Sequence, residues 1–348
     1  MKKLILIALA AVLAACGQSP KGSGREKLAG AGATFPLPYY NLAFKTYRDS
    51  VPAEVSYGGI GSGGGIRSLK DRIVDFAGSD AYLTDAEMAA MPDSVIHIPT
   101  CMGAVVMAYN LPGVEKLKLT GELVADIYLG KITRWNDARI RGINPGVQLP
   151  DLEIHPVYRS DGSGTTFVFS DYLTKVSPAW KETIGAGKSL EWPAGLAAKG
   201  NPGISGTVSQ TEGAVGYIGS EYAFAQHISY ASLQNKAGRF IDPTLESISA
   251  AAAGDLPTDT RCMITDPDAA DAYPISCFTW ILLYKEQGYD KRTREQSEAL
   301  VDLLGWMLGS QAQDLAGKVN YTPLPQQVID NGRAQLGTVT YKGEKLLK

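Results

Sequence analysis

The chain has 348 residues, a formal net charge of −3 and 20% charged side chains. Hydrophobic residues make up 45%, an ordinary share for a soluble globular protein, and the length suits about two domains. This balance excludes a basic nucleic-acid-binding protein and a disordered polyelectrolyte. One stretch alone is apolar enough to concern a membrane, and it lies at the very start.

The N-terminus has the pattern of an export signal. Lys2 and Lys3 precede an apolar run over residues 4–13, which is too short to span a bilayer and fits the core of a signal peptide. Small residues lead into Cys16, as in a lipobox, so we predict a lipoprotein signal peptide over 1–15 and a lipid on Cys16. A plain secretory signal with a fortuitous cysteine is the alternative. Residues 16–27 are rich in Gly, Ser and Lys and predict a flexible tether.

Export places the other cysteines in an oxidising compartment, where one disulfide and one free thiol are expected. Cys262 and Cys277 are close enough in sequence for a hairpin-like bridge. Cys101 and Cys277 lie at the starts of two strand-like runs and form the alternative pair. The three histidines are scattered without the spacing of metal ligands, so we expect no metal site.

Short apolar runs alternate with amphipathic stretches, which is typical of an α/β protein. In chain order, strands are predicted at 27–30, 54–57, 74–77, 104–109, 154–158, 214–218 and 278–284, and helices at 38–48, 64–71, 120–129, 165–176 and 295–309. The run 278–284 is too apolar for an edge strand and is expected to return the chain to the first domain. We therefore predict two α/β domains, 28–108 plus 277–345 and 109–276, joined by two crossings with a ligand between them.

Three Gly-rich turns each lie between a predicted strand and a predicted helix. Their sequences are GAGATFP at 30–36, GGIGSGGG at 58–65 and RSDGSGTT at 159–166. Each places backbone N–H groups and a hydroxyl at a helix N-terminus, where an anion is bound well. One such turn is most often an ordinary helix cap, whereas three in one chain indicate a shared anion site.

Two charged residues suggest which anion this site prefers. Arg159 can grip a tetrahedral oxyanion, because a guanidinium donates two parallel N–H bonds, and Asp161 is placed to hold it. Asp80 lies where a predicted strand leaves the sheet. A carboxylate repels a fully ionised anion such as sulfate but accepts a hydrogen bond from one that keeps a proton, as phosphate does. The alternatives are that Arg159 and Asp161 form an ordinary surface ion pair and that Asp80 is an ordinary loop carboxylate.

Other motifs compete with this interpretation. Residues 59–64 match G-x-G-x-x-G with Asp80 at the distance of a ribose-binding acid, but export argues against a nicotinamide cofactor. Residues 187–189 resemble a P-loop end, yet Glu182 stands where that loop needs glycine. No G-x-S-x-G is present. A phosphate-ester hydrolase stays open, since sequence does not show which base lies near the serines in space.

Taken together in chain order, the motifs of this sequence resemble those of the periplasmic phosphate-binding proteins of high-affinity phosphate ABC importers. The resemblance rests on 30–36, 59–64, 74–80, 126–132 with Trp135, 159–169, Trp192-Pro193 and 213–217. It runs from about residue 28 to residue 335, nearly the whole exported chain.

The resemblance implies a two-lobed fold of type II that closes on one dehydrated phosphate and passes it to a membrane permease, without enzymatic activity or a cofactor. It also implies a monomer on the periplasmic face of the envelope, held through Cys16. The phosphate ligands it implies are Thr34, Phe35, Ser62, Asp80, Arg159, Ser163, Gly164 and Thr165, with Asp161 bracing the arginine. A receptor for another oxyanion and a phosphate-ester hydrolase remain the alternatives.

Overall fold

A computed structural model of the chain describes residues 26–51 and 53–347. The expected signal peptide, the lipid on Cys16 and most of the tether lie outside these residues. One mixed sheet of eight strands, ordered β2-β1-β3-β11-β4-β8-β6-β7, runs through the molecule. Its strands are β1 (Glu26–Gly32), β2 (Ala53–Gly59), β3 (Phe76–Ser79), β4 (Val95–Tyr109), β6 (His155–Arg159), β7 (Leu196–Ala198), β8 (Ala214–Gly219) and β11 (Ser276–Tyr284).

Two long central strands join the two ends of this sheet. The first part of β4 pairs antiparallel with β11, and its last five residues pair antiparallel with β8. Every residue of β4 and of β11 is buried, as expected for strands covered on both faces. The prediction that residues 278–284 do not form an edge strand is confirmed, because β11 lies between β3 and β4.

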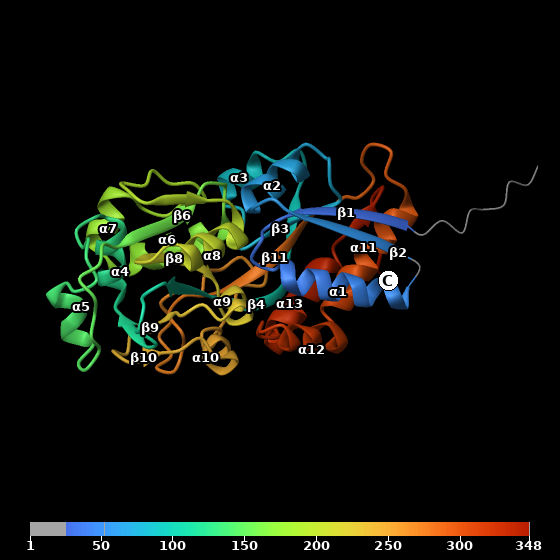
Figure 1. Cartoon of the computed structure of the whole chain (residues 1–348). Helices are drawn as coiled ribbons and strands as arrows, with labels where there is room; N and C mark the ends of the chain where they lie inside the picture. Colours follow the sequence, from blue (N-terminus) through green and yellow to red (C-terminus); the bar gives the residue numbers. More distant parts are fainter. Residues whose placement is uncertain (1–25, 52, 348) are drawn as a thin grey trace, which may run out of the picture.

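The molecule is two-lobed, and Figure 1 shows the lobes side by side. The first lobe is built on β1, β2 and β3, with α1 packed on β2 and with α2 and α11 packed on β1. Helices of this lobe are α1 (Leu37–Ser50), α2 (Ser62–Lys70), α3 (Asp85–Ala89), α11 (Arg294–Met307), α12 (Ser310–Lys318) and α13 (Gln326–Leu336). A small hairpin, β12 (Thr340–Tyr341) and β13 (Glu344–Lys345), ends the described chain.

The second lobe is built on β6, β7 and β8, which pair in parallel. A separate sheet of three short strands lies in it: β5 (Leu117–Leu119), β9 (Ala231–Gln234) and β10 (Phe240–Ile241). Its helices are α4 (Gly121–Tyr128), α5 (Ala138–Ile143), α6 (Gly164–Val176), α7 (Pro178–Thr183), α8 (Gly200–Gln210), α9 (Ser220–Gln226) and α10 (Leu245–Ala250). Of these, α6 and α8 pack on β8.

β4 begins nine residues before the predicted strand 104–109, at Val95. This extension includes Pro99, which has no N–H for a ladder. The structure accommodates the proline with an irregularity in the pairing: Trp280 faces Pro99 and Thr279 faces Cys101, so one residue of β4 has no partner. Such bulges are where a strand tolerates proline.

The expected disulfide is not formed, and Cys101, Cys262 and Cys277 are free thiols. Cys101 and Cys277 lie on neighbouring strands, but their direct partners are Thr279 and Gly103, so the two cysteines are diagonal neighbours. Diagonal pairs are about 7–8 Å apart, beyond the usual span of a disulfide. Cys262 lines a small cavity together with Phe278, which lies on the opposite face of β11 from Cys277.

Within 26–51 and 53–347, no helix is long and apolar enough to cross a bilayer. Over the same residues, no group of three or more His, Cys, Asp or Glu side chains is arranged to hold a metal ion.

Candidate functional site

The three Gly-rich turns meet where the two lobes face each other. The turn after β2 contacts the turn after β6: the N–H of Gly63 donates to the carbonyl of Gly162 at 2.8 Å. The N–H of Gly164 donates to the Ser62 hydroxyl at 3.1 Å. The turn after β1 reaches the second lobe through Thr34, whose hydroxyl accepts from the backbone N–H of Asn201 at 3.0 Å. The site is therefore assembled from both lobes.

Glycines permit this close approach. Gly61 has a φ of +84°, and a Cβ on it would overlap the carboxylate of Asp161 in the other lobe. A Cβ on Gly164 would lie 2.8 Å from the Cβ of Asp80, closer than two carbons pack. At both positions a larger residue would hold the lobes apart, so the glycines serve the contact between lobes as well as the helix starts.

Arg159 and Asp161 form the buried ion pair that the sequence predicted. Nε and Nη2 of the arginine donate to the two carboxylate oxygens at 2.7 and 2.5 Å. The side chain of Arg159 is 1% exposed and that of Asp161 is 12% exposed. Burial works to raise the pKa of Asp161, but the hydrogen bonds and charge of Arg159 hold it below the ordinary value. The carboxylate also accepts from the N–H of Gly200 at 3.0 Å, which fixes the pair against α8.

Asp80 lies at the end of β3 and is 1% exposed. One carboxyl oxygen accepts from the Thr279 hydroxyl at 3.0 Å, and the other accepts from the Thr165 hydroxyl at 3.3 Å. Burial raises the pKa of Asp80 to about 7, against the lowering effects of Thr279, Arg159 and Thr165. Near neutral pH this carboxyl can therefore keep a proton or, in its ionised form, accept a hydrogen bond from a protonated ligand.

The serines hold the start of α6. The Ser163 hydroxyl accepts from the N–H of Thr166 at 3.0 Å and caps the helix, as the Gly-Ser turn predicted. The Ser62 hydroxyl accepts from Gly164 and, at 3.4 Å, from the N–H of Asp80. Thr165 is the second residue of the helix, and its hydroxyl accepts from Nη1 of Arg159 at 3.4 Å. The dipole of α6 thus points its positive end at Asp80 and Arg159.

Phe35 has a different role from the polar residues around it. Its ring is fully buried and meets the ring of Tyr321 edge-on, 6.0 Å between centroids. Its carbonyl accepts from the Tyr321 hydroxyl at 2.5 Å. The side chain therefore anchors the turn, which leaves the backbone as the part of Phe35 that a ligand can use.

The structure brings together seven of the expected residues: five share direct hydrogen bonds, Thr34 reaches Thr165 through Asn201, and Ser163 precedes Gly164 in the chain. They are Thr34, Ser62, Asp80, Arg159, Ser163, Gly164 and Thr165, with Asp161 as the brace. Sequence reasoning missed Thr279 and Asn201. Thr279 lies inside a uniformly apolar strand, and Asn201 lies in the Gly- and Pro-rich start of α8, which did not read as a helix.

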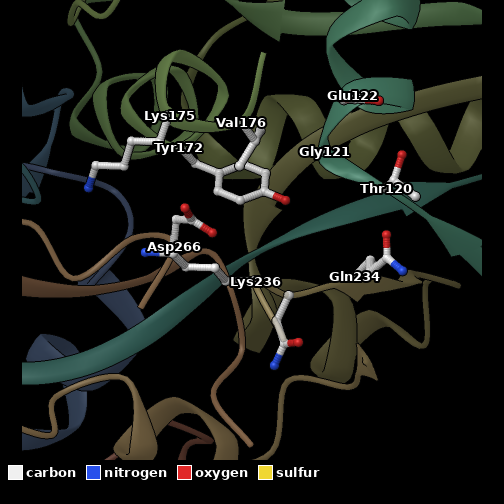
Figure 2. A pocket seen from close by; sticks show the side chains of 10 residues that line it. Thr120, Gly121, Glu122, Tyr172, Lys175, Val176, Gln234, Lys236 and Asp266 are labelled. Carbon is white, nitrogen blue, oxygen red and sulfur yellow. The ribbon is translucent and has the colours of Figure 1, made fainter. Parts of the chain in front are cut away.

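A pocket of about 390 Å³ in the second lobe is a different place (Figure 2). Lys175 and Lys236 line it and would be its anion-binding groups. Both ammonium groups are already engaged: Lys175 donates to the Thr265 hydroxyl at 2.7 Å, and Lys236 pairs with Asp268 at 2.5 Å. None of the expected ligand residues lines this pocket, so it is not the anion site.

A family model described as the PBP superfamily domain matches residues 17–311. The "Phosphate-binding protein PstS" of Xylella fastidiosa (strain Temecula1 / ATCC 700964) is 40% identical over 308 residues, 87% of this chain and 83% of that protein. Proteins of the same name from Pasteurella multocida (strain Pm70) and Methanocaldococcus jannaschii are 39% and 34% identical, over 90% and 94% of this chain and 90% and 92% of their own lengths.

Solved structures show the same fold. A high-affinity periplasmic phosphate-binding protein, PfluDING, bound with phosphate, has a TM-score of 0.72 at 21% identity, over 88% of this chain and 93% of its own. The phosphate-binding protein of Stenotrophomonas maltophilia has a TM-score of 0.69 at 22% identity with the same coverage. Fold and site thus define a two-lobed protein of the PBP superfamily. Within it, the chain belongs to the PstS family of phosphate-binding proteins.

Proposed function

We propose that this chain binds inorganic phosphate between its two lobes and delivers it to the permease of an ABC importer. The observation that carries the proposal is the pair of opposite charges that the lobes bring together. Arg159, braced by Asp161, comes from the second lobe, and the buried carboxyl of Asp80 comes from the first. The relatives named for phosphate binding support the same ligand.

In this proposal, closure of the lobes surrounds the ion with donors. Thr34, Ser62 and Thr165 offer hydroxyls, Phe35 and Gly164 offer N–H groups, and Ser163 lies at the helix start. The guanidinium of Arg159 offers one Nη1 proton and one Nη2 proton, because Asp161 takes the Nε proton and one Nη2 proton and Thr165 takes one Nη1 proton. Binding needs no acid–base chemistry and no cofactor, so we propose a receptor and not an enzyme.

Asp80 gives the site its selectivity in this account. A phosphate that keeps a proton donates it to the carboxylate, which turns a repulsion into a hydrogen bond. Sulfate has no proton at neutral pH and would leave two negative groups facing each other in a buried site. Arsenate, which keeps a proton as phosphate does, is not excluded by this device.

We also propose how the chain is placed in the cell envelope. Residues 1–15 act as a lipoprotein signal peptide, Cys16 carries the lipid, and 16–27 form a tether on the periplasmic face. The bilobed part is then 28–108 plus 277–345 and 109–276, with β4 and β11 as the two crossings. It acts as a monomer that the permease recognises when the lobes are closed.

Isothermal titration tests the function. The chain from residue 17 onward is unfolded and refolded to remove carried-over phosphate, and phosphate and then sulfate are titrated into it. The proposal predicts one tight site for phosphate and no heat with sulfate. No heat with phosphate in folded protein would contradict it. Turnover of a chromogenic phosphomonoester that depends on Ser62 or Ser163 would favour a hydrolase instead.

A further inference from the structure

A buried asparagine lies between the two threonine hydroxyls of the site, one from each lobe. Asn201 is fully buried at the second residue of α8. Its side-chain Nδ2 donates to Thr34 Oγ1 at 3.1 Å and to Thr165 Oγ1 at 3.2 Å. Its backbone N–H, which no turn of the helix uses, donates to Thr34 Oγ1 at 3.0 Å.

The orientation of this amide is fixed by a bond on its other side. The Oδ1 atom of Asn201 accepts from the N–H of Gly219 at 2.9 Å. A flipped amide would place two N–H donors against that N–H and an oxygen between the hydroxyls. Because Gly219 can only donate, the amide nitrogen must face Thr34 and Thr165.

This arrangement decides the direction of both hydroxyl protons. A hydroxyl has two acceptor lone pairs and one proton to donate. Thr34 Oγ1 accepts twice from Asn201, so both lone pairs are filled and the proton is left to donate. Thr165 Oγ1 accepts from Asn201 and from Arg159 Nη1, and its proton points to Asp80 Oδ2 at 3.3 Å. Both hydroxyls are therefore set as donors.

We infer that Asn201 is a positioning residue that keeps both threonine hydroxyls as donors, that of Thr34 toward the bound anion and that of Thr165 toward Asp80, and ties the two lobes together on closure. The inference rests on the proposed function and adds a residue that does not touch the ligand. Donor-only hydroxyls suit an oxyanion, whose unprotonated oxygens can only accept. Without the Asn201 side chain each hydroxyl loses one of the two donors that fill its lone pairs, so its proton is held less firmly and binding must then order it.

The test replaces Asn201 and a matched asparagine. Asn144 is 4% exposed in the second lobe and holds its loop with three hydrogen bonds to Lys118 and Ile140. We expect Asn201→Leu to weaken phosphate binding about tenfold or more, since two hydroxyl donors lose the amide that orients them. Asn144→Leu should lower the unfolding free energy as much and leave phosphate affinity unchanged. Equal affinity of the Asn201→Leu and unsubstituted proteins would overturn the inference.

A double substitution separates positioning from a structural effect. If Asn201 acts through the threonine hydroxyls, Asn201→Leu should cost much less phosphate affinity when Thr34 and Thr165 are already valine. Additive losses would overturn the inference. Should Asn201→Leu fail to fold, Asn201→Asp serves in its place. It keeps the bond to Gly219 but replaces the amide donor between the two hydroxyls with a carboxylate oxygen, which can only accept. Unchanged phosphate affinity in that variant would overturn the inference too.

The same titrations separate this inference from the proposed function. Phosphate binding by the unsubstituted chain with no effect at Asn201 would remove the positioning role alone. No phosphate binding by the unsubstituted chain would remove both, because the oriented hydroxyls would then serve no anion.

Discussion

The hydroxyl of Ser62 accepts a hydrogen bond from the N–H of Gly164 at 3.1 Å, and the two residues belong to different lobes. Each stands at the start of a helix, α2 or α6. A second bond, from Gly63 to the carbonyl of Gly162, runs beside it at 2.8 Å. The lobes thus meet through main chain and a small side chain, and this close approach makes the closed state sensitive to one added methyl group.

Gly164→Ala tests this sensitivity. The added Cβ would lie 2.8 Å from the Cβ of Asp80 and 2.5 Å from the Ser62 hydroxyl, so closure is opposed. We expect phosphate affinity to fall by about tenfold or more, as overpacking of 1–3 kcal/mol implies. Small-angle scattering with phosphate present should show a more extended molecule than the unsubstituted protein.

Gly206→Ala is the matched control. Gly206 lies inside α8, and a Cβ there meets nothing within 4 Å. Alanine should stabilise the helix by about 0.5–1 kcal/mol and leave phosphate affinity as it is. A Gly164→Ala protein that closes and binds phosphate like the Gly206→Ala protein would show that the contact between the lobes tolerates a methyl group at residue 164.

Arg159→Ala removes the guanidinium that we propose faces the ligand. Because the side chain is buried and its partner Asp161 would be left unpaired, we expect a loss of about 3–5 kcal/mol in phosphate binding. Titration calorimetry measures this loss.

Arg139 offers a matched control, since it pairs with Asp137 at the same two-residue spacing but is 49% exposed. Arg139→Ala should change stability by less than about 1 kcal/mol and phosphate affinity not at all. Similar phosphate affinities for the two variants would mean that Arg159 faces elsewhere.

The ligand-free protein should lose stability as pH rises because of Asp80. Burial raises the pKa of this carboxyl from 3.8 to about 7, so the folded state keeps a proton that the unfolded chain releases between those values. The unfolding free energy then falls by up to about 1.4 kcal/mol per pH unit over that window. Urea unfolding of the unsubstituted and Asp80→Asn proteins should give a difference that grows from acid to neutral pH. A difference independent of pH would contradict the raised pKa.

Glu221 should act on stability in the same direction without touching the ligand. It is 2% exposed, and neither carboxyl oxygen has a hydrogen-bond partner among the described residues. The neighbouring Tyr321 hydroxyl donates to Phe35 instead. Burial, reinforced by the charge of Asp80, raises the pKa of Glu221 well above its ordinary value. Glu221→Gln should therefore stabilise the protein, and more so at pH 8 than at pH 5.

The pKa of Glu286 is shifted in the opposite direction from that of Glu221. Burial works to raise its pKa, but hydrogen bonds from Thr340 and from the N–H groups of Gly343, Gly288 and Lys342 lower it. Glu286→Gln should destabilise the protein at neutral pH and have less effect at acid pH. If both glutamine variants shift the unfolding free energy in the same direction, the environments assigned to the two carboxyls are wrong.

Local pattern was sufficient for much of this fold. The strand 278–284 was predicted within two residues of β11, because a run of apolar residues without a break has no other place than the middle of a sheet. The three Gly-rich turns were located for a similar reason, since each combines a strand, a turn and a helix start. Thr34 and Arg159 were predicted as ligand residues because they lie in those turns.

What the sequence missed depends on contacts between distant segments. Asn201 and Thr279 reach the site from α8 and β11, and neither sits in a motif of its own. The disulfide prediction failed for the same reason: it used spacing along the chain, whereas strand register places Cys101 and Cys277 diagonally. A bulge opposite Pro99 likewise became visible only once β4 and β11 were paired.

We propose that Asp80 selects phosphate by accepting a hydrogen bond from the proton that phosphate keeps. Competition of sulfate against labelled phosphate, in the unsubstituted and Asp80→Asn proteins at pH 8, tests it most directly. The account predicts that sulfate fails to displace phosphate from the unsubstituted protein. In Asp80→Asn it predicts weaker phosphate binding or measurable displacement by sulfate. Unchanged phosphate affinity together with unchanged rejection of sulfate would contradict the account and remove Asp80 from the site.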